Sequence, residues 1–257
     1  MPLLDIRNIS IRFGGLLAVD GFSMQMGPND ICGLIGPNGA GKTTVFNMLT
    51  GVYKPALGTI WLDGESIGGL KPYNITKKGV ARTFQNIRLM KNLSVLDNVK
   101  ISYVYQTRCS LTESILHLPR YYGEQEEVAK NSLELLKVFH LDGKEKELAA
   151  NLPYGEQRRL EIARALATHP KLLLLDEPAA GMNPQETAEL AELIRWIRRE
   201  FKIAILLIEH DMRLVMGVCE RIVVLDYGRV IAEGKPEQIR NDPKVVEAYL
   251  GREAAHA

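Results

Sequence analysis

The feature that most constrains this chain is a glycine-rich segment at residues 36–44, with the sequence GPNGAGKTT. It matches the pattern GxxxxGK[ST], in which small residues let the backbone wrap closely around phosphate groups. The apolar run at residues 31–35 predicts a buried strand, and residues 43–49 have the apolar spacing of a helix. Because the pattern requires a strand before it and a helix after it, the segment predicts a phosphate-binding loop. A glycine-rich turn with an incidental lysine is the alternative.

Each residue type in this loop has a use in phosphate binding. The backbone N–H groups and the helix N-terminus supply donors and a partial positive charge. Lys42 adds a full charge for the β- and γ-phosphates, and the Thr43 hydroxyl is a ligand for Mg²⁺. A nucleoside triphosphate and Mg²⁺ are therefore the expected ligands of this loop. The loop residues expected to bind the nucleotide are Gly36, Pro37, Asn38, Gly39, Ala40, Gly41, Lys42, Thr43 and Thr44.

Two carboxylates follow a second apolar run, residues 172–175. Strand ends are where α/β folds place ligand chemistry. Asp176 is expected to hold Mg²⁺, directly or through water, and Glu177 to polarise a water molecule for attack on the γ-phosphate. An exposed strand end that is acidic by chance is the alternative, and the phosphate loop favours the catalytic interpretation.

Strand and helix patterns alternate along the chain, with one helical interruption. Residues 3–26 alternate apolar and polar residues, which predicts antiparallel strands, and residues 58–67 predict a hairpin that turns at Asp63-Gly64. The later β and α segments predict an α/β fold with a mainly parallel sheet and helices on both faces. We expect one domain over residues 1–257, with an α/β core at residues 1–85 and 158–257 and a helical subdomain at residues 86–157.

The net charge of the chain indicates which classes of partner it could attract. The chain has 32 Lys+Arg and 31 Asp+Glu, a formal net charge of +1, so it has no broad field that would attract nucleic acid. Its apolar runs are far shorter than the ~20 residues that cross a bilayer, and its start lacks a secretion signal. The three cysteines share no CxxC spacing. We therefore expect a reduced, cytosolic protein that does not bind nucleic acid.

Further residues, in order along the chain, resemble the ATP-binding subunits of ABC transporters over essentially the full length. Gln85 stands where that family has its Q-loop glutamine, and His210 stands at its switch histidine. Phe13 matches the aromatic residue that stacks on adenine. The resemblance implies a P-loop NTPase (RecA-like) core with an antiparallel β subdomain and an inserted helical subdomain. It also implies catalytic roles for Gln85, Glu177 and His210, with Gln85 as a further Mg²⁺ ligand.

The family's signature, usually Leu-Ser-Gly-Gly-Gln, reads LPYGE at residues 152–156. In related proteins it holds the γ-phosphate of ATP bound to the opposite subunit of a head-to-tail dimer. Pro153 removes both a hydroxyl and an N–H donor, which leaves Tyr154, Gly155 and the helix N-terminus for this contact, with Glu156 in the last position. The signature residues implied to bind nucleotide are Pro153, Tyr154, Gly155 and Glu156.

The family's D-loop corresponds to residues 179–184, with Asn183 where an aspartate is usual. From the residues alone, Asn183 is a good N-cap, because Pro184 follows at the first helical position and Glu186 at the third. A capping role does not exclude contact across a dimer.

The Pro-Tyr signature, the opening Phe13-Gly14-Gly15-Leu16 and the long helical insertion most resemble the ATP-binding subunits of bacterial branched-chain amino-acid importers. That resemblance implies a second ATP-binding subunit, in a homodimer or a heterodimer, two integral membrane permease subunits, and a peripheral place at the cytoplasmic face of the cell membrane. The alternatives are an ATPase of another transporter, a soluble ABC ATPase acting on nucleic acid or ribosomes, and a P-loop kinase. A kinase leaves His210 and residues 152–157 unexplained.

Overall fold

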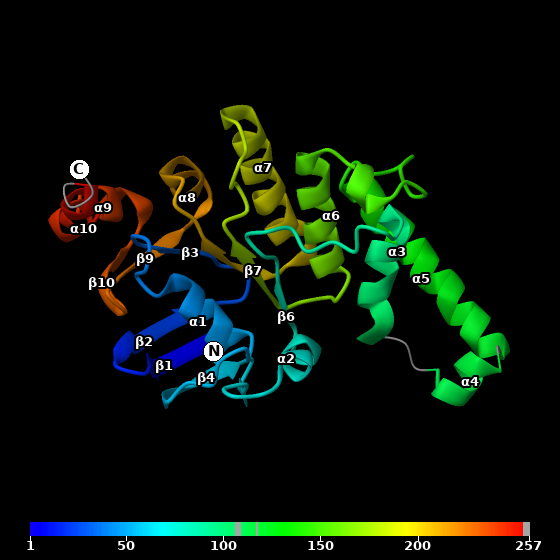
Figure 1. The fold of residues 1–257 in the computed structure, drawn as a ribbon, viewed down its shortest axis with the longest axis horizontal. Helices are drawn as coiled ribbons and strands as arrows, with labels where there is room; N and C mark the ends of the chain where they lie inside the picture. Colours follow the sequence, from blue (N-terminus) through cyan, green and yellow to red (C-terminus); the bar gives the residue numbers. More distant parts are fainter. Residues whose placement is uncertain (106–108, 117, 254–257) are drawn as a thin grey trace. The chain divides into compact units, whose positions relative to one another are not determined.

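The computed structural model describes residues 1–105, 109–116 and 118–253 (Figure 1). The chain divides into two compact units. The first combines Met1–Gln85 with Lys171–Ala257, and the second is Asn86–Pro170. Among the described residues, no helix has the length and apolar character needed to cross a membrane.

The first unit contains the mainly parallel sheet that the sequence predicts. Its six strands lie in the order β10-β9-β3-β8-β7-β6, and every neighbouring pair is parallel except β9 and β10. All residues of β3, β7 and β8 are buried, which explains why their sequences are continuous apolar runs. The strands are β3 (Ile31–Ile35), β6 (Val80–Arg82), β7 (Leu172–Asp176), β8 (Ala204–Ile208), β9 (Arg221–Asp226) and β10 (Arg229–Gly234).

A four-stranded antiparallel sheet completes the β structure of this unit, in the order β2-β1-β4-β5. The expected hairpin joins β4 and β5, and both turn residues have positive φ, at 49° for Asp63 and 78° for Gly64. Such a turn matches the twist of the strands that it joins. The strands are β1 (Leu4–Phe13), β2 (Leu16–Met26), β4 (Leu57–Leu62) and β5 (Glu65–Ser66).

Helix α1 lies between the two sheets. Its buried residues Val45 and Phe46 share one apolar cluster with Phe22 of the antiparallel sheet and Leu34 and Leu174 of the parallel sheet. Figure 1 shows α7 and α8 on the opposite side of the parallel sheet from α1. Helices therefore cover both faces, as expected. The helices of this unit are α1 (Lys42–Leu49), α2 (Pro72–Lys78), α7 (Pro184–Phe201), α8 (Met212–Val218), α9 (Pro236–Arg240) and α10 (Pro243–Glu253).

The second unit is helical and longer than expected at its C-terminal end. The helical subdomain is expected to end at residue 157, whereas the compact unit ends at Pro170. The reason is that α6 is one continuous helix that begins at Tyr154 and packs against α3 and α5, so a boundary at residue 157 cuts through its first turn. The elements are α3 (Val95–Lys100), a 3₁₀ helix (Ile101–Tyr105), α4 (Leu111–Ile115), α5 (Pro119–Val138), a second 3₁₀ helix (Ala149–Asn151) and α6 (Tyr154–Leu166).

The predicted cap of α7 is confirmed. The side-chain oxygen of Asn183 accepts hydrogen bonds from the backbone N of Gln185 (2.9 Å) and of Glu186 (3.0 Å). In return, the Glu186 carboxylate accepts from the backbone N of Asn183 at 2.8 Å. These bonds satisfy N–H groups that the first helical turn leaves unpaired.

We expect Asn183→Ala to lower the free energy of unfolding by about 1 kcal/mol, because it removes the cap acceptor. Denaturant titration measures the change. Asn183→Asp is the matched control, since it keeps a cap acceptor and is expected to stay close to wild type. An equal loss of stability in both variants would contradict the capping role.

Candidate nucleotide-binding and catalytic site

The phosphate loop runs from the end of β3 to the start of α1, and two of its glycines allow close backbone packing. Gly36 has φ 148°, and a Cβ there would overlap the carbonyl oxygen of Leu225 in β9. Gly41 has φ 106°, and a Cβ there would lie 2.6 Å from the carbonyl oxygen of Ala18 in β2. Only glycine suits both positions, because each combines positive φ with backbone contact. The loop therefore packs against the backbone of both sheets, at β9 and at β2.

Lys42 is the buried cation of this loop. Its Nζ donates to the carbonyl oxygen of Gly36 at 2.7 Å and to that of Pro37 at 3.0 Å. These contacts hold the ammonium group inside the curve of the loop, next to the N-terminus of α1. The hydroxyl-bearing residues Thr43 and Thr44 follow in the first helical turn, where Thr43 is exposed. The loop therefore gathers a full positive charge and helix N–H groups at one place.

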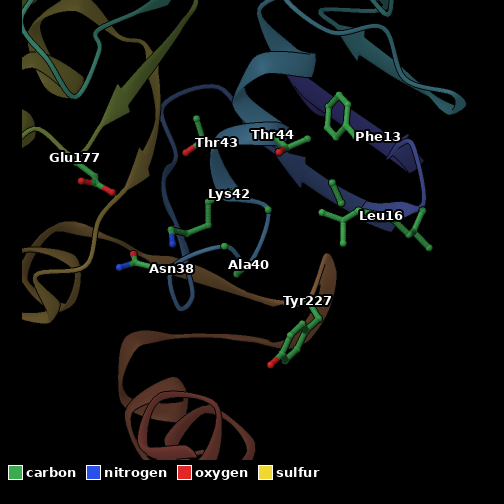
Figure 2. Close-up of a pocket in the computed structure, with 13 residues that line it drawn as sticks. Phe13, Leu16, Asn38, Ala40, Lys42, Thr43, Thr44, Glu177 and Tyr227 are labelled. Atoms are coloured by element: carbon green, nitrogen blue, oxygen red, sulfur yellow. The ribbon is translucent and has the colours of Figure 1, made fainter. Parts of the chain in front are cut away.

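A pocket with a cavity volume of about 380 Å³ lies at the loop, and Figure 2 shows the residues that line it. Phe13 lies at one end, with 42% of its surface exposed, and its ring makes an edge contact with Tyr53 at a centroid distance of 5.0 Å. A partly exposed ring that is held by a neighbour suits stacking on a flat base. The lining residues are Phe13, Leu16, Leu17, Ala18, Asn38, Gly39, Ala40, Gly41, Lys42, Thr43, Thr44, Glu177 and Tyr227.

Three polar side chains that are distant in sequence meet beside this pocket. Gln85 donates through Nε2 to Oε2 of Glu177 at 2.6 Å. The Nδ1 atom of His210 lies 3.8 Å from the same oxygen. Glu177 follows β7 and His210 follows β8, and these two strands are parallel neighbours whose carboxyl ends share one edge of the sheet. The topology therefore brings together the three residues for which the family resemblance implied catalytic roles.

Asp176 is held by an arginine that the sequence analysis did not identify. Nη2 of Arg82 lies 2.6 Å from Oδ2 of Asp176, and both side chains are 7% exposed. Arg82 also donates to the Asn47 side chain at 2.8 Å, and its guanidinium lies over the rings of Phe46 and Phe84. The buried charge of Asp176 is thus paired, as a buried carboxylate requires.

The donors near the loop fit a magnesium ion that also binds substrate phosphates. In the described part of the chain, Arg82 bonds to Oδ2 of Asp176, which leaves Oδ1 for a cation. Thr43 carries a hydroxyl and Gln85 an amide oxygen, both of which are oxygen donors of the type that Mg²⁺ binds. No group of three or more His, Cys, Asp or Glu side chains among the described residues could hold a metal ion. A few oxygen ligands combined with phosphates are typical of Mg²⁺ sites.

The signature residues lie in the helical unit, at the start of α6. Pro153 occupies the N-cap position, but its side chain makes no capping hydrogen bond, and Tyr154 is the first helical residue. The Tyr154 hydroxyl lies 3.3 Å from Nη2 of Arg158, which is fully buried. Glu156 is engaged by Lys144, whose Nζ lies 2.5 Å from its carboxylate. Pro153, Tyr154, Gly155 and Glu156 therefore form the N-terminal turn of one helix, and Glu156 there already has a cationic partner.

Three residues at or next to the site were not predicted from the sequence. Tyr227 lines the pocket from the turn between β9 and β10 and is 75% exposed. Arg82 gave no local signal, because its partner Asp176 is far away in sequence. Glu209 is fully buried next to His210, and a glutamate that continues an apolar strand was the available signal.

A phosphate loop between a strand and a helix, beside a strand that ends in two acidic residues, defines a nucleoside triphosphatase of the P-loop class. The sequence matches the ABC transporter family over residues 19–180. Residues 229–255 match a second family, the branched-chain amino acid ATP-binding cassette transporters. The chain therefore belongs to the ABC transporter family, and within it to the ATP-binding cassettes, which are ATPases.

Similar proteins cover nearly the whole chain. It is 48% identical over 250 residues to the high-affinity branched-chain amino acid transport ATP-binding protein LivG of Escherichia coli K12, which covers 97% of this chain and 98% of the relative. It is 45% identical over 250 residues, with the same coverage, to the corresponding protein BraF of Pseudomonas aeruginosa. An ATP-binding cassette of an ABC transporter, solved in its ADP conformation, superposes with a TM-score of 0.85 at 31% identity, covering 98% of this chain and 99% of that one.

Proposed function

We propose that this chain is the ATP-hydrolysing subunit of an importer for branched-chain amino acids. The similarity to LivG and BraF over nearly the full length supports this substrate class. So does the match of residues 229–255 to the branched-chain cassette family. The chain itself binds ATP, and the amino acid is recognised by other subunits.

One observation carries the proposal of hydrolysis: Glu177 lies beside the phosphate loop with Gln85 and His210 around its carboxylate. Glu177 is the general base that orients a water molecule and accepts its proton as the water oxygen attacks the γ-phosphorus. The bond between the γ-phosphorus and the bridging oxygen breaks, and ADP leaves. Gln85 and His210 hold the Glu177 carboxylate in a fixed position relative to the γ-phosphate. These roles depend on positioning more than on covalent chemistry.

The remaining residues of the site bind and orient the substrate. Residues 36–44 hold the phosphates through backbone N–H groups and Lys42, and Phe13 stacks on adenine. Thr43, Gln85 and Asp176 would hold Mg²⁺, which supplies charge neutralisation on the phosphates when bound. Arg82 orients Asp176, because it pairs with one of its two carboxylate oxygens.

The working assembly contains more than this chain. We propose that residues 153–156 contact the ATP of a second ATP-binding subunit, identical or related, and that two integral membrane permease subunits complete the importer. The chain then works at the cytoplasmic face of the cell membrane without entering the bilayer and without nucleic acid. Pro153 cannot donate a hydrogen bond, so Tyr154 and Gly155 at the start of α6 carry the signature contact.

The test is reconstitution of this chain with its permease subunits in vesicles that contain ATP on the cytoplasmic side. We expect uptake of leucine, isoleucine or valine that requires ATP and is abolished by Glu177→Gln. Lysine serves as the unrelated solute. Assembly with permease subunits but no uptake of a branched-chain amino acid would refute the substrate class. Recovery of the chain with RNA or DNA, rather than with membrane subunits, would refute the transport function itself.

A further inference from the structure

Glu209 is a buried carboxylate between two loops of the catalytic site. Its Oε1 accepts a hydrogen bond from the backbone N of Ala179 at 2.7 Å. Its Oε2 accepts from the backbone N of His210 at 3.0 Å and of Asp211 at 3.3 Å. In the described parts of the chain its only ionic neighbour is His210, because no lysine or arginine pairs with it. Burial raises the pKa of the Glu209 carboxyl above its ordinary value, and the three N–H groups oppose that rise.

The first loop carries Glu177 in a strained conformation. Glu177 has φ 46°, in the left-handed region that residues other than glycine rarely adopt. The loop turns back at once, since the backbone N of Ala180 donates to the carbonyl oxygen of Glu177 at 3.2 Å. Such strain persists only where the surroundings over-determine the backbone. Here the surroundings are the bond from the N of Glu177 to the carbonyl oxygen of Ile208 (2.9 Å) and the bond from Ala179 to Glu209.

The second loop carries His210. The Nδ1 atom of this histidine lies 3.8 Å from Oε2 of Glu177 and 3.9 Å from Oε2 of Glu209, so the imidazole faces both carboxylates. Oε2 of Glu209 also accepts a hydrogen bond from the backbone N of His210, so the Glu209 side chain holds the backbone of this loop. Glu209 thus contacts both the loop that carries Glu177 and the loop that carries His210. It is not among the described residues that line the pocket.

We propose that Glu209 is a positioning residue that clamps the strained Glu177 turn to the His210 loop, and so fixes the Glu177 carboxylate relative to the attacking water. The inference rests on the proposed hydrolytic role of Glu177. Glu209 is not among the described residues that line the pocket, so it acts through the two loops. A carboxylate suits this place because its two oxygens accept all three converging N–H donors, one at Oε1 and two at Oε2.

The test is Glu209→Gln in the full chain within its assembled transporter. Glutamine keeps the volume but offers one acceptor oxygen, so its NH₂ group faces either the Ala179 N–H or the His210 and Asp211 N–H groups. We expect kcat to fall by roughly tenfold or more, since small misplacements of a catalytic group are costly, while KM for ATP stays within about twofold. Glu220→Gln is the matched control, because that carboxylate is 53% exposed and pairs with Arg198 at the surface.

Two further measurements separate positioning from a merely structural role. In the Glu177→Gln background, Glu209→Gln should have no further effect on residual hydrolysis, because Glu209 acts through Glu177. Amide hydrogen exchange at Ala179 should speed up in Glu209→Gln. If folding of Glu209→Gln fails, Glu209→Asp keeps the charge, is too short to span both loops, and should give the same kinetic pattern.

The inference is overturned if kcat of Glu209→Gln stays within about twofold of wild type, if KM changes as much as kcat, or if the losses of Glu209→Gln and Glu177→Gln multiply. Failure of the proposed function has a different signature: Glu177→Gln would then hydrolyse ATP as fast as wild type. A normal Glu209→Gln beside an inactive Glu177→Gln would refute the clamp and leave the proposed function standing.

Discussion

Glu177→Gln is expected to lower kcat for ATP hydrolysis by about 10²–10³-fold, because an amide cannot accept the proton of the attacking water. The amide oxygen can still accept the hydrogen bond from Gln85, which joins the two side chains at 2.6 Å. The pocket should therefore keep its shape, and the affinity for ATP should change little. The variant is expected to separate hydrolysis from binding.

Steady-state ATPase activity and nucleotide affinity measure the two effects independently. Glu189→Gln is the matched control, since Glu189 is an exposed carboxylate on α7 and its change should leave both quantities as in wild type. If Glu177→Gln hydrolyses ATP near the wild-type rate, another group is the base. If it loses ATP affinity instead, Glu177 contributes to binding rather than to the chemical step.

Lys42→Ala is expected to weaken ATP binding by about 10–100-fold, and hydrolysis with it. The physical reason is the loss of charge-assisted hydrogen bonds, worth about 1.5–3 kcal/mol in total, in a loop with no second buried ammonium group among the described residues. Isothermal titration with ATP and with adenosine measures the effect. Affinity for adenosine, which has no phosphate, should stay unchanged because Phe13 lies apart from Lys42 in the pocket (Figure 2).

Lys171→Ala provides the matched control for charge removal. Lys171 is half exposed and pairs with Asp63 at the surface of the same unit, so its loss changes the net charge without touching the pocket. An equal loss of ATP affinity in both lysine variants would show that the effect is a general one of charge. A Lys42→Ala protein that binds ATP normally would contradict the assigned role of the phosphate loop.

Much of the fold was predictable because its signals are local. The buried strands β3, β7 and β8 appear as short apolar runs, the phosphate loop as a glycine pattern, and the α7 cap as Asn183, Pro184 and Glu186 in order. Each of these signals lies within a few residues of the structure that it specifies. The expected boundary at residue 157 differs from the end of the compact unit at Pro170 for the complementary reason. The helices against which α6 packs decide which unit it belongs to, and the sequence of α6 does not specify them.

The phosphate loop, the acidic strand end and the ordered motifs of an ABC cassette are all visible in the amino-acid sequence. Three contacts became visible only in the folded chain: Arg82 pairs with Asp176, Tyr227 reaches the pocket, and Glu209 joins the loops of Glu177 and His210. The two groups differ in the sequence separation of the residues involved. A motif records the backbone and charge that one segment needs, whereas a buried side chain finds its partner only when parallel strands bring distant segments to the same edge of the sheet.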